Sequence, residues 1–339
     1  MKYILSSILA LAMSVTASVA QIPGMMSMPS AQPLEGTSLG ANETISYDGI
    51  ALGNRVKLRG YVDFIYNYTD SGSNDDASFS TAGGVDFLVD FSPVTGEVHL
   101  AYANGASQPV TLEQVFGRYS FNQDFHFTFG RQATVLGFDA DEAPGLYAVT
   151  TAYSMGAFSH PGKSYVDGIR LNYNNGMFGL ILGLHDEYGL SSLTGSSDDL
   201  DDGIAIDLAA SVMFMPGLEA RLGFVNDNGS ADDDVQQING WLGWSPGDLT
   251  LAIEFDNFSL ANDKDAWNMM LLANYQFSDF FGATLRYAHM DHEAKESDRI
   301  TLALLFSITD NFGMNLEYSY TDMDSDDANE FYLEALLTY

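Results

Sequence analysis

One pattern runs through most of the chain: apolar and polar residues alternate with a period of two. From Arg55 to Tyr68 the even positions are apolar except for Gly60, while the odd positions include Lys57, Arg59 and Asp63. Successive side chains of a β-strand point to opposite faces, so this segment predicts a strand with one apolar face and one polar face. Similar segments follow as far as the last residue, and they add up to about 16 strands.

The spacing of these strands favours a transmembrane antiparallel β-barrel. Each strand with its connection takes about 18 residues, which suits a membrane-crossing strand of about 9 to 11 residues plus a turn or loop. Short connections alternate with longer acidic ones, such as Asp186 to Gly203 with six acids and Thr321 to Glu330 with five. The short connections are 92–96, 122–124, 174–176, 215–217, 245–248, 278–279 and 308–311. We therefore predict an all-β barrel with short periplasmic turns and long acidic extracellular loops.

Composition agrees with this fold and excludes other classes of protein. Asp and Glu outnumber Lys and Arg by 46 to 13, and a net charge of −33 would repel nucleic acid. Aromatic residues make up 13% of the chain, more than an acidic disordered chain contains. The absence of cysteine rules out disulfides and thiolate-bound metals. A soluble β-sandwich also alternates, but this chain has no spare layer to cover its apolar faces.

The N-terminal part of the chain predicts export. A basic residue at Lys2, an apolar stretch from Ile4 to Val15 and small residues before Gln21 are typical of a cleaved signal peptide, residues 1–20. Residues 21–54 contain prolines, glycines and methionines with no period, which indicates a flexible periplasmic lead. The barrel is then expected over residues 55–339, in the bacterial outer membrane.

A short patch carries a family resemblance. Residues 130–138 resemble the Gly-basic-x-x-Thr-x-x-Gly stretch of bacterial outer-membrane porins, most closely those of the OmpL-like β-barrel porin 2 family, and Ala152, Tyr153 and Ser154 follow as they do there. Met155 stands where that family leads us to expect an arginine. The terminal Tyr339 and the strand pattern fit the same resemblance, which covers nearly the whole mature chain. It implies passive passage of solutes through the barrel.

Strand parity predicts which charged side chains face a water-filled lumen. The longest connection, 132–165, is placed like the loop that folds into the lumen of general porins, and it carries Asp139, Asp141 and Glu142. If it folds inward, these acids face Arg118, Arg170 and other wall arginines across a constriction; otherwise they lie in a solvated surface loop. The predicted pore-lining residues are Lys57, Arg59, Asp63, Asp86, Asp90, Arg118, Arg170, Asp207, Arg221, Glu254, Arg286, Arg299 and Glu317.

These features predict passive diffusion of small hydrophilic solutes and ions. Fixed acids at a pore mouth concentrate cations within a Debye length of about 8 Å, so we expect cations to be preferred. One alternative is a non-conducting structural or adhesive barrel whose acidic loops bind divalent ions, lipopolysaccharide or a surface partner. Another is a substrate-specific channel with a ladder formed by Tyr61, Trp241 and Tyr332. Outer-membrane lipid and lipopolysaccharide are the expected surroundings. The sequence leaves undecided whether the barrel forms a homotrimer.

The sequence predicts no catalytic site, no metal site and no cofactor. Outer-membrane enzymes need a histidine positioned with a serine or an aspartate near the barrel rim. His289 falls on the lipid-facing register with no serine beside it on its own strand, and His292 follows Asp291 in a predicted exposed loop. The run that starts at Asp322 begins like a calcium loop, but Asp327 stands where that loop needs glycine.

Overall fold

The computed structural model describes residues 50–72, 74–104, 109–139, 143–153, 165–186, 204–228, 235–260, 264–292, 295–324 and 326–339. The predicted signal peptide and most of the predicted lead therefore lie outside the described residues. In the part of the chain that is described, no helix is long and apolar enough to cross a membrane.

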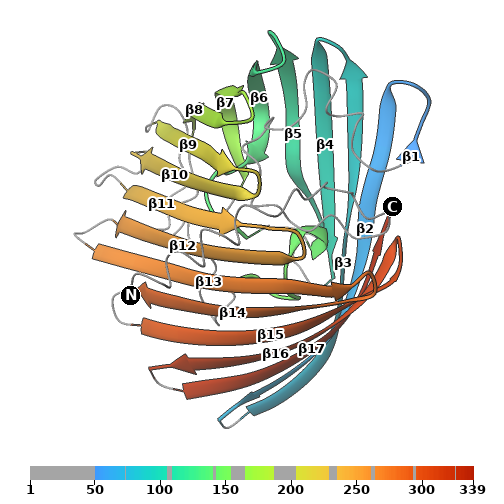
Figure 1. Ribbon diagram of the computed structural model, residues 1–339, viewed down its shortest axis with the longest axis vertical. Helices are drawn as coiled ribbons and strands as arrows, with labels where there is room; N and C mark the ends of the chain where they lie inside the picture. The colour runs from blue at the N-terminus through green and yellow to red at the C-terminus, as the bar shows by residue number, and fades with distance from the viewer. Residues whose placement is uncertain are drawn as a thin grey trace, which may run out of the picture.

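The fold is a closed antiparallel barrel of 16 strands, as predicted (Figure 1). Each strand from β2 to β17 pairs with its neighbours in the chain, and β17 pairs with β2 to close the ring. A short 3-10 helix, η1 (Ala143–Gly145), lies between β6 and β7 in the chain. The strands are β1 (Ile50–Ala51), β2 (Val56–Ser71), β3 (Asn74–Phe91), β4 (Val94–Ala103), β5 (Val110–Ser120), β6 (Phe125–Ala133), β7 (Tyr165–Asn174), β8 (Phe178–His185), β9 (Ala205–Met215), β10 (Leu218–Asp227), β11 (Val235–Trp244), β12 (Leu249–Leu260), β13 (Lys264–Ser278), β14 (Phe281–His292), β15 (Lys295–Thr309), β16 (Phe312–Met323) and β17 (Asp326–Thr338).

The two ends of the barrel chain meet at one rim. The backbones of Gly60 and Tyr339 exchange two hydrogen bonds of 2.8 and 2.9 Å, next to the pairing of Tyr61 with Thr338. Beyond that point β1 continues the ladder, with Ile50 opposite Leu58. Residues 50 and 51, which the sequence assigns to the lead, therefore pair with the barrel.

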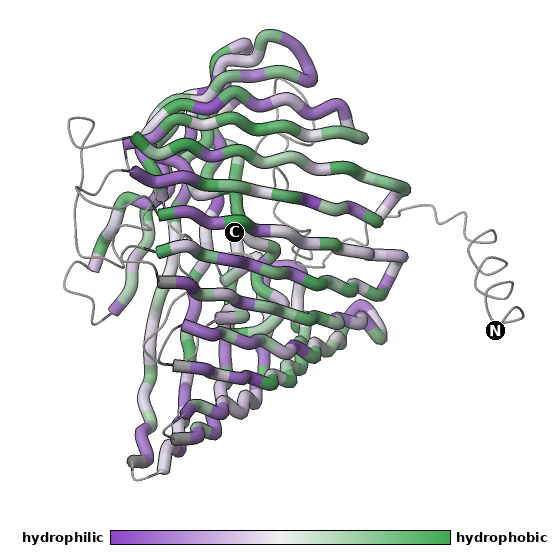
Figure 2. The backbone as a smooth tube through the Cα atoms, turned by 90° about the vertical axis from the view of Figure 1, so that its left-hand side faces the viewer, coloured by the Kyte–Doolittle hydropathy of each residue, from purple (hydrophilic) through white to green (hydrophobic). Residues whose placement is uncertain are grey.

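The two faces of the barrel wall differ in the way that the period of two predicts. Along the strands hydrophilic and hydrophobic residues alternate (Figure 2). Charged groups point inward and are mostly buried, whereas the outward side chains are apolar and exposed. Exposed outward residues include Phe64, Leu180, Leu182, Phe255, Leu271, Leu285, Ile300 and Leu302.

The tight turns lie where the sequence predicts them, and together they define the short-turn rim. Strand β7 ends at Asn174 and β8 begins at Phe178, and Gly176 adopts a φ of 83° in that turn. A left-handed conformation of this kind favours glycine because it has no Cβ.

At the opposite rim, which we call the far rim, some connections are shorter than the sequence predicts. The acids of residues 321–330 predict a long loop, but β16 runs to Met323 and β17 begins at Asp326. Similarly, β2 ends at Ser71 and β3 begins at Asn74. The acids there lie mainly on strands that continue past the apolar belt. Strands of 16 and 18 residues are longer than a bilayer requires, and their water-exposed ends tolerate charge.

Candidate functional site

A segment of the chain folds into the barrel between β6 and β7, and we call residues 134–139 and 143–153 the inner segment. Its hydrogen-bond partners lie on β10, β11, β12, β14, β15 and β16, and η1 lies close to β17. In a ring of 16 strands β15 is opposite β7, so the inner segment crosses the lumen to the far wall. Within the predicted 132–165 connection, residues 134–139 and 143–153 therefore contact the inner wall of the barrel.

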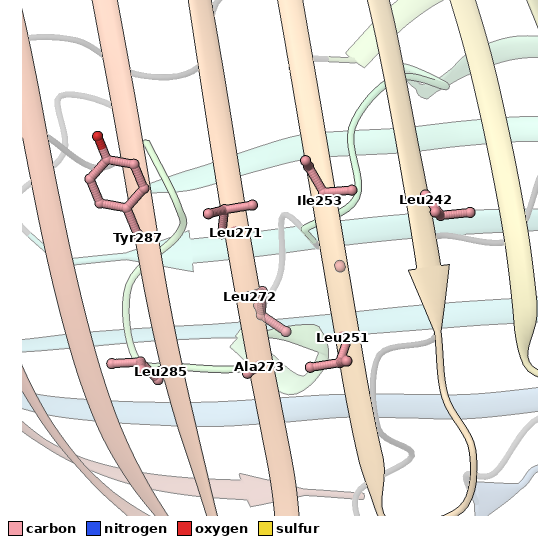
Figure 3. A pocket seen from close by; sticks show the side chains of 9 residues that line it. Leu242, Leu251, Ile253, Leu271, Leu272, Ala273, Leu285 and Tyr287 are labelled. Atoms are coloured by element: carbon pink, nitrogen blue, oxygen red, sulfur yellow. The ribbon is translucent and has the colours of Figure 1, made fainter. Parts of the chain in front are cut away.

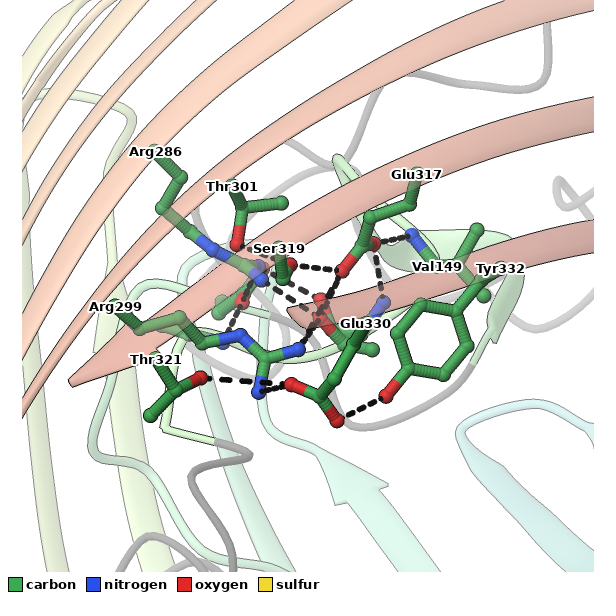
Figure 4. A network of polar contacts seen from close by, with 12 residues as sticks. Val149, Arg286, Arg299, Thr301, Glu317, Ser319, Thr321, Glu330 and Tyr332 are labelled. Atoms are coloured by element: carbon green, nitrogen blue, oxygen red, sulfur yellow. Dashed lines mark hydrogen bonds and ion pairs between the residues drawn. The ribbon is translucent and has the colours of Figure 1, made fainter. Parts of the chain in front are cut away.

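The strongest clamp on the inner segment is a single carboxylate of β16. Glu317 accepts hydrogen bonds from the backbone N–H groups of Val149 and Thr150, at 2.7 and 2.9 Å, and from Thr150 Oγ1 at 2.6 Å (Figure 4). Its side chain is almost fully buried, and the guanidinium of Arg299 lies 3.7 Å away. Arg299 in turn pairs with Glu330 at 2.9 Å. Hydrogen bonds to a charged group are roughly twice as strong as neutral ones, so this contact fixes the position of the segment.

A buried ion pair also holds the inner segment against the wall. Arg286 of β14 pairs with Asp139 at 3.1 Å and also donates to the carbonyl oxygen of Thr150 at 2.7 Å. The same carboxylate of Asp139 accepts the backbone N–H of Ala152 at 2.9 Å. The sequence predicts Asp139 opposite Arg118, Arg170 and other wall arginines across a constriction. Arg286 is one of these other wall arginines, and Asp139 contacts it directly because the segment reaches the far wall.

Polar and aromatic contacts hold the first part of the inner segment against β10, β11 and β12. Arg221 donates to the carbonyl of Val135, Asn239 accepts the N–H of Gly137, and Glu254 accepts the N–H of Phe138. The ring of Phe138 packs edge-on against Trp241, with centroids 5.6 Å apart, and stacks on Tyr147 at 5.9 Å. Trp241 therefore packs against the inner segment, and its ring is not free to bind a solute as the substrate-specific alternative requires.

The wall next to the start of the segment contains a fully buried charge cluster. Arg170 of β7 donates to Asp207 of β9 at 3.0 and 3.2 Å, and His185 Nε2 lies 3.2 Å from the same carboxylate. Gly183 of β8 is the direct cross-strand partner of both Arg170 and Asp207. A side chain there would collide with the carboxylate, so the glycine allows the two charges to meet across β8. Arg170 also donates to the carbonyl of Ala133, where the inner segment begins.

The wall formed by β2 to β5 carries further polar side chains on its inward face. Arg59 pairs with Asp86 at 2.7 Å, and His99 lies 3.3 Å from Asp86 and 2.9 Å from Glu97. The remaining predicted pore-lining residues of this wall are Lys57 and Asp63 on β2, Asp90 on β3 and Arg118 on β5.

All thirteen predicted wall residues lie on strands, on the inward register. Arg221, Glu254, Arg286, Arg299 and Glu317 contact the inner segment, whereas Arg170 and Asp207 form the charge cluster next to its start. Of the three predicted loop acids, Asp139 lies in the lumen, while Asp141 and Glu142 lie outside the described residues. Asn239, Thr284 and Thr150 also hold the inner segment, although the sequence pattern does not predict this role for them. Strand parity predicts that Asn239 and Thr284 point inward. Their partners in the inner segment are more than 100 residues away in the chain, so no pattern near either residue predicts the contact.

Two tyrosines of the inner segment are buried between charged groups. The carbonyl oxygen of Tyr147 accepts a hydrogen bond from the hydroxyl of Thr284 at 2.5 Å. Burial, together with the nearby Asp139 carboxylate, raises the pKa of the Tyr147 phenol. Burial and the carboxylate of Glu254 likewise raise the pKa of Tyr153. Both phenols are therefore neutral at physiological pH.

A shallow apolar depression of about 460 Å³ lies on the wall of β11 to β14 (Figure 3). Its lining includes Leu242, Leu251, Ile253, Leu271 and Leu285. These side chains offer no chemistry for a polar solute, and they match the apolar belt of the outer face.

Comparison with known proteins shows similarity in fold alone. No family model matches the chain, and no curated protein matches it. The outer membrane channel DcaP of Acinetobacter baumannii superposes with a TM-score of 0.65 at 14% identity, over 86% of this chain and all of that one. An anion-selective porin from Comamonas acidovorans gives 0.61 at 13% identity, over 84% and 99% of the two chains. OmpT of Vibrio cholerae, in its trimer form, gives 0.56 at 15% identity, over 84% and 100%.

Proposed function

We propose that this chain is an outer-membrane porin that lets small hydrophilic solutes and ions diffuse passively. The observation that carries the proposal is the inner segment, which polar contacts clamp across a closed barrel with a charged inner face. An apolar outer face suits lipid, and a charged inner face suits water. Two structures of the same fold are described as a channel and as a porin, which supports the same function.

The pore, on this proposal, runs between the inner segment and the wall of β2 to β5. The hydrogen bonds described for the inner segment reach strands from β10 to β16, and we propose that the passage runs beside the wall of β2 to β5. The side chains that would then meet a solute include the half-buried Lys57 and Arg59, while Asp63, Asp90 and Arg118 lie buried in the same wall. Their mixture of charges would favour polar solutes without selecting one chemical class.

We also propose a preference for cations. An anion-selective porin has the same fold, so the charges of the individual chain, not the fold, decide the sign of selectivity. Here the net charge is −33, and acids such as Asp70, Asp75, Asp291 and Asp322 lie on strand ends at the far rim. Cations would concentrate at this rim, and the effect would weaken as salt screens the charges.

Location and assembly follow as parts of the same proposal. Residues 1–20 would be removed on export, residues 21–54 would form mainly a periplasmic lead, and the barrel would lie among outer-membrane lipid and lipopolysaccharide. The OmpL-like resemblance, carried by residues 130–138, is part of this proposal. A homotrimer is the assembly we propose, because a solved barrel of the same fold has a trimer form.

Single-channel recording tests the proposal. The refolded protein is added to planar bilayers, and reversal potentials are measured in a KCl gradient at low and at high salt. We expect discrete conductance steps and a cation preference that declines as salt rises. If correctly folded protein gives no steps, the porin proposal fails and a non-conducting structural barrel takes its place.

A further inference from the structure

A cluster of metal-ligand side chains lies outside the lumen, on the outer wall near the far rim. It consists of His289 of β14 with Glu296 and Asp298 of β15, and their ligand atoms all lie within 4.8 Å of one another. We propose that these three side chains bind a divalent transition-metal ion such as Zn²⁺. This inference depends only on the barrel fold and not on channel activity.

The strand register places this cluster just beyond the lipid-facing belt. On the outer register of β14, Leu285 is followed by Tyr287 and then by His289, three residues before the strand ends at His292. Leu285 is 56% exposed, as a lipid-facing side chain should be, and a tyrosine next to it is typical of the membrane interface. The cluster therefore lies at headgroup level, where water and metal ions have access.

The ladder around the cluster places acids directly opposite acids. Asp291 pairs with Glu296, Asp298 pairs with Asp322, and Asp322 pairs with Asp327. None of these acids has a lysine or an arginine as a direct partner in the described registers. Like charges directly opposite each other destabilise a sheet, so a bound cation would offset a repulsion that is built into the wall.

The histidine provides a second, independent indication of a ligand. His289 is only 6% exposed, its Nδ1 lies 3.1 Å from Asp298 Oδ1, and its Nε2 has no hydrogen-bond partner among the residues that the structure describes. A nitrogen and an oxygen bound to one tetrahedral zinc lie about 3.3 Å apart, given metal–ligand distances of about 2.0 to 2.2 Å. The observed separation of the two atoms is therefore compatible with both binding one ion.

Neighbouring side chains hold the ligands in place. Tyr287 donates its hydroxyl to Asp298 Oδ1 at 2.5 Å, and the ring of Trp267 packs on the imidazole with centroids 4.3 Å apart. Trp267 also donates its Nε1 hydrogen to Asp291 at 3.0 Å. Such contacts fix the orientation of metal ligands in known sites.

The ligand types indicate which metal the site prefers. Calcium and magnesium take oxygen ligands, whereas imidazole suits zinc, copper and nickel. One histidine and two carboxylates leave further coordination positions for water. The three ligands come from two strands joined by a hairpin and not from one short motif, which is why spacing in the sequence does not indicate the site.

The test is metal binding to the full refolded chain in detergent. Calorimetric titration with ZnCl₂ and the visible absorption of bound Co²⁺ would be compared for the wild type, His289→Ala and Asp298→Asn. His292→Ala is the matched control, because that histidine lies on the opposite face of the same strand. Heat-modifiable migration on gels checks that each variant has folded.

We expect one strong zinc site in the wild type and in His292→Ala, and a loss of affinity of about tenfold or more in the two ligand variants. Millimolar calcium should not displace the zinc. The proposal is overturned if the folded wild type binds no zinc or cobalt, if His289→Ala binds as tightly as the wild type, or if calcium competes equally. The last two results would mean that the acids alone hold cations.

Discussion

The replacement Glu317→Ala would release the inner segment from the wall. The carboxylate accepts three hydrogen bonds from Val149 and Thr150, and each bond to a charged group contributes about 1.5 to 3 kcal/mol. Because the three bonds share one group, their energies do not add, and we take the total as about 3 kcal/mol. That change shifts the balance between the clamped and the released segment on the order of 100-fold. A released segment would move within the lumen and modulate the current.

Open-channel current noise in planar bilayers measures this release. We expect more noise and brief changes of conductance in Glu317→Ala. Glu97→Ala is the matched control, since it removes a buried inward carboxylate of β4 that pairs with His99 at 2.9 Å. If Glu317→Ala is as quiet as the wild type and Glu97→Ala, the clamp does not hold the segment and our interpretation of the lumen is wrong.

Three further predictions concern stability. Gly60→Ala places a Cβ against the backbone of Gly84 where the ring closes, so heat-modifiable folded protein should be lost, whereas Gly96→Ala, with its nearest neighbour at an ordinary 3.6 Å, should fold normally. Asp207→Ala leaves buried positive charge unpaired and should cost about 3 to 5 kcal/mol in urea unfolding, unlike the exposed Asp248→Ala. Burial raises the pKa of Tyr147, so folding favours the neutral phenol. The resulting stabilisation is complete below the ordinary tyrosine pKa of about 10, and it is lost as the pH rises through the pKa of the folded state. Tyr147→Phe should remove one late-titrating phenol from the tyrosinate absorbance curve; an unchanged curve would show that Tyr147 is not buried.

Strand parity could be predicted from the sequence because a barrel wall imposes one rule on every strand. Apolar residues face out and polar residues face in. Only a few residue types fit a tight turn such as the one at Gly176, so the turns can also be recognised in the sequence. The extent of the strands was harder to predict, because beyond the apolar belt both faces meet water and the alternation loses its cause. This explains why residues 321–330, with their five acids, suggest a loop although most of them lie on β16 and β17.

The partners inside the lumen could not be predicted from the sequence. Asp139 and Arg286 are 147 residues apart, and their contact depends on the path of the inner segment across the barrel. Parity shows that Arg286 points inward but not which charge reaches it. The cluster of His289, Glu296 and Asp298 is similar, since it depends on the register between β14 and β15.

The most direct test of a lumen that is narrowed but open is liposome swelling with neutral solutes of increasing size. Liposomes that contain the refolded protein are diluted into isotonic solutions of small polyols, then of monosaccharides, disaccharides and larger sugars. We predict rapid swelling with the smallest solutes and a steep decline as solute size increases, with a weaker decline in Glu317→Ala. No swelling with any solute, from protein that is folded and inserted, would contradict the account.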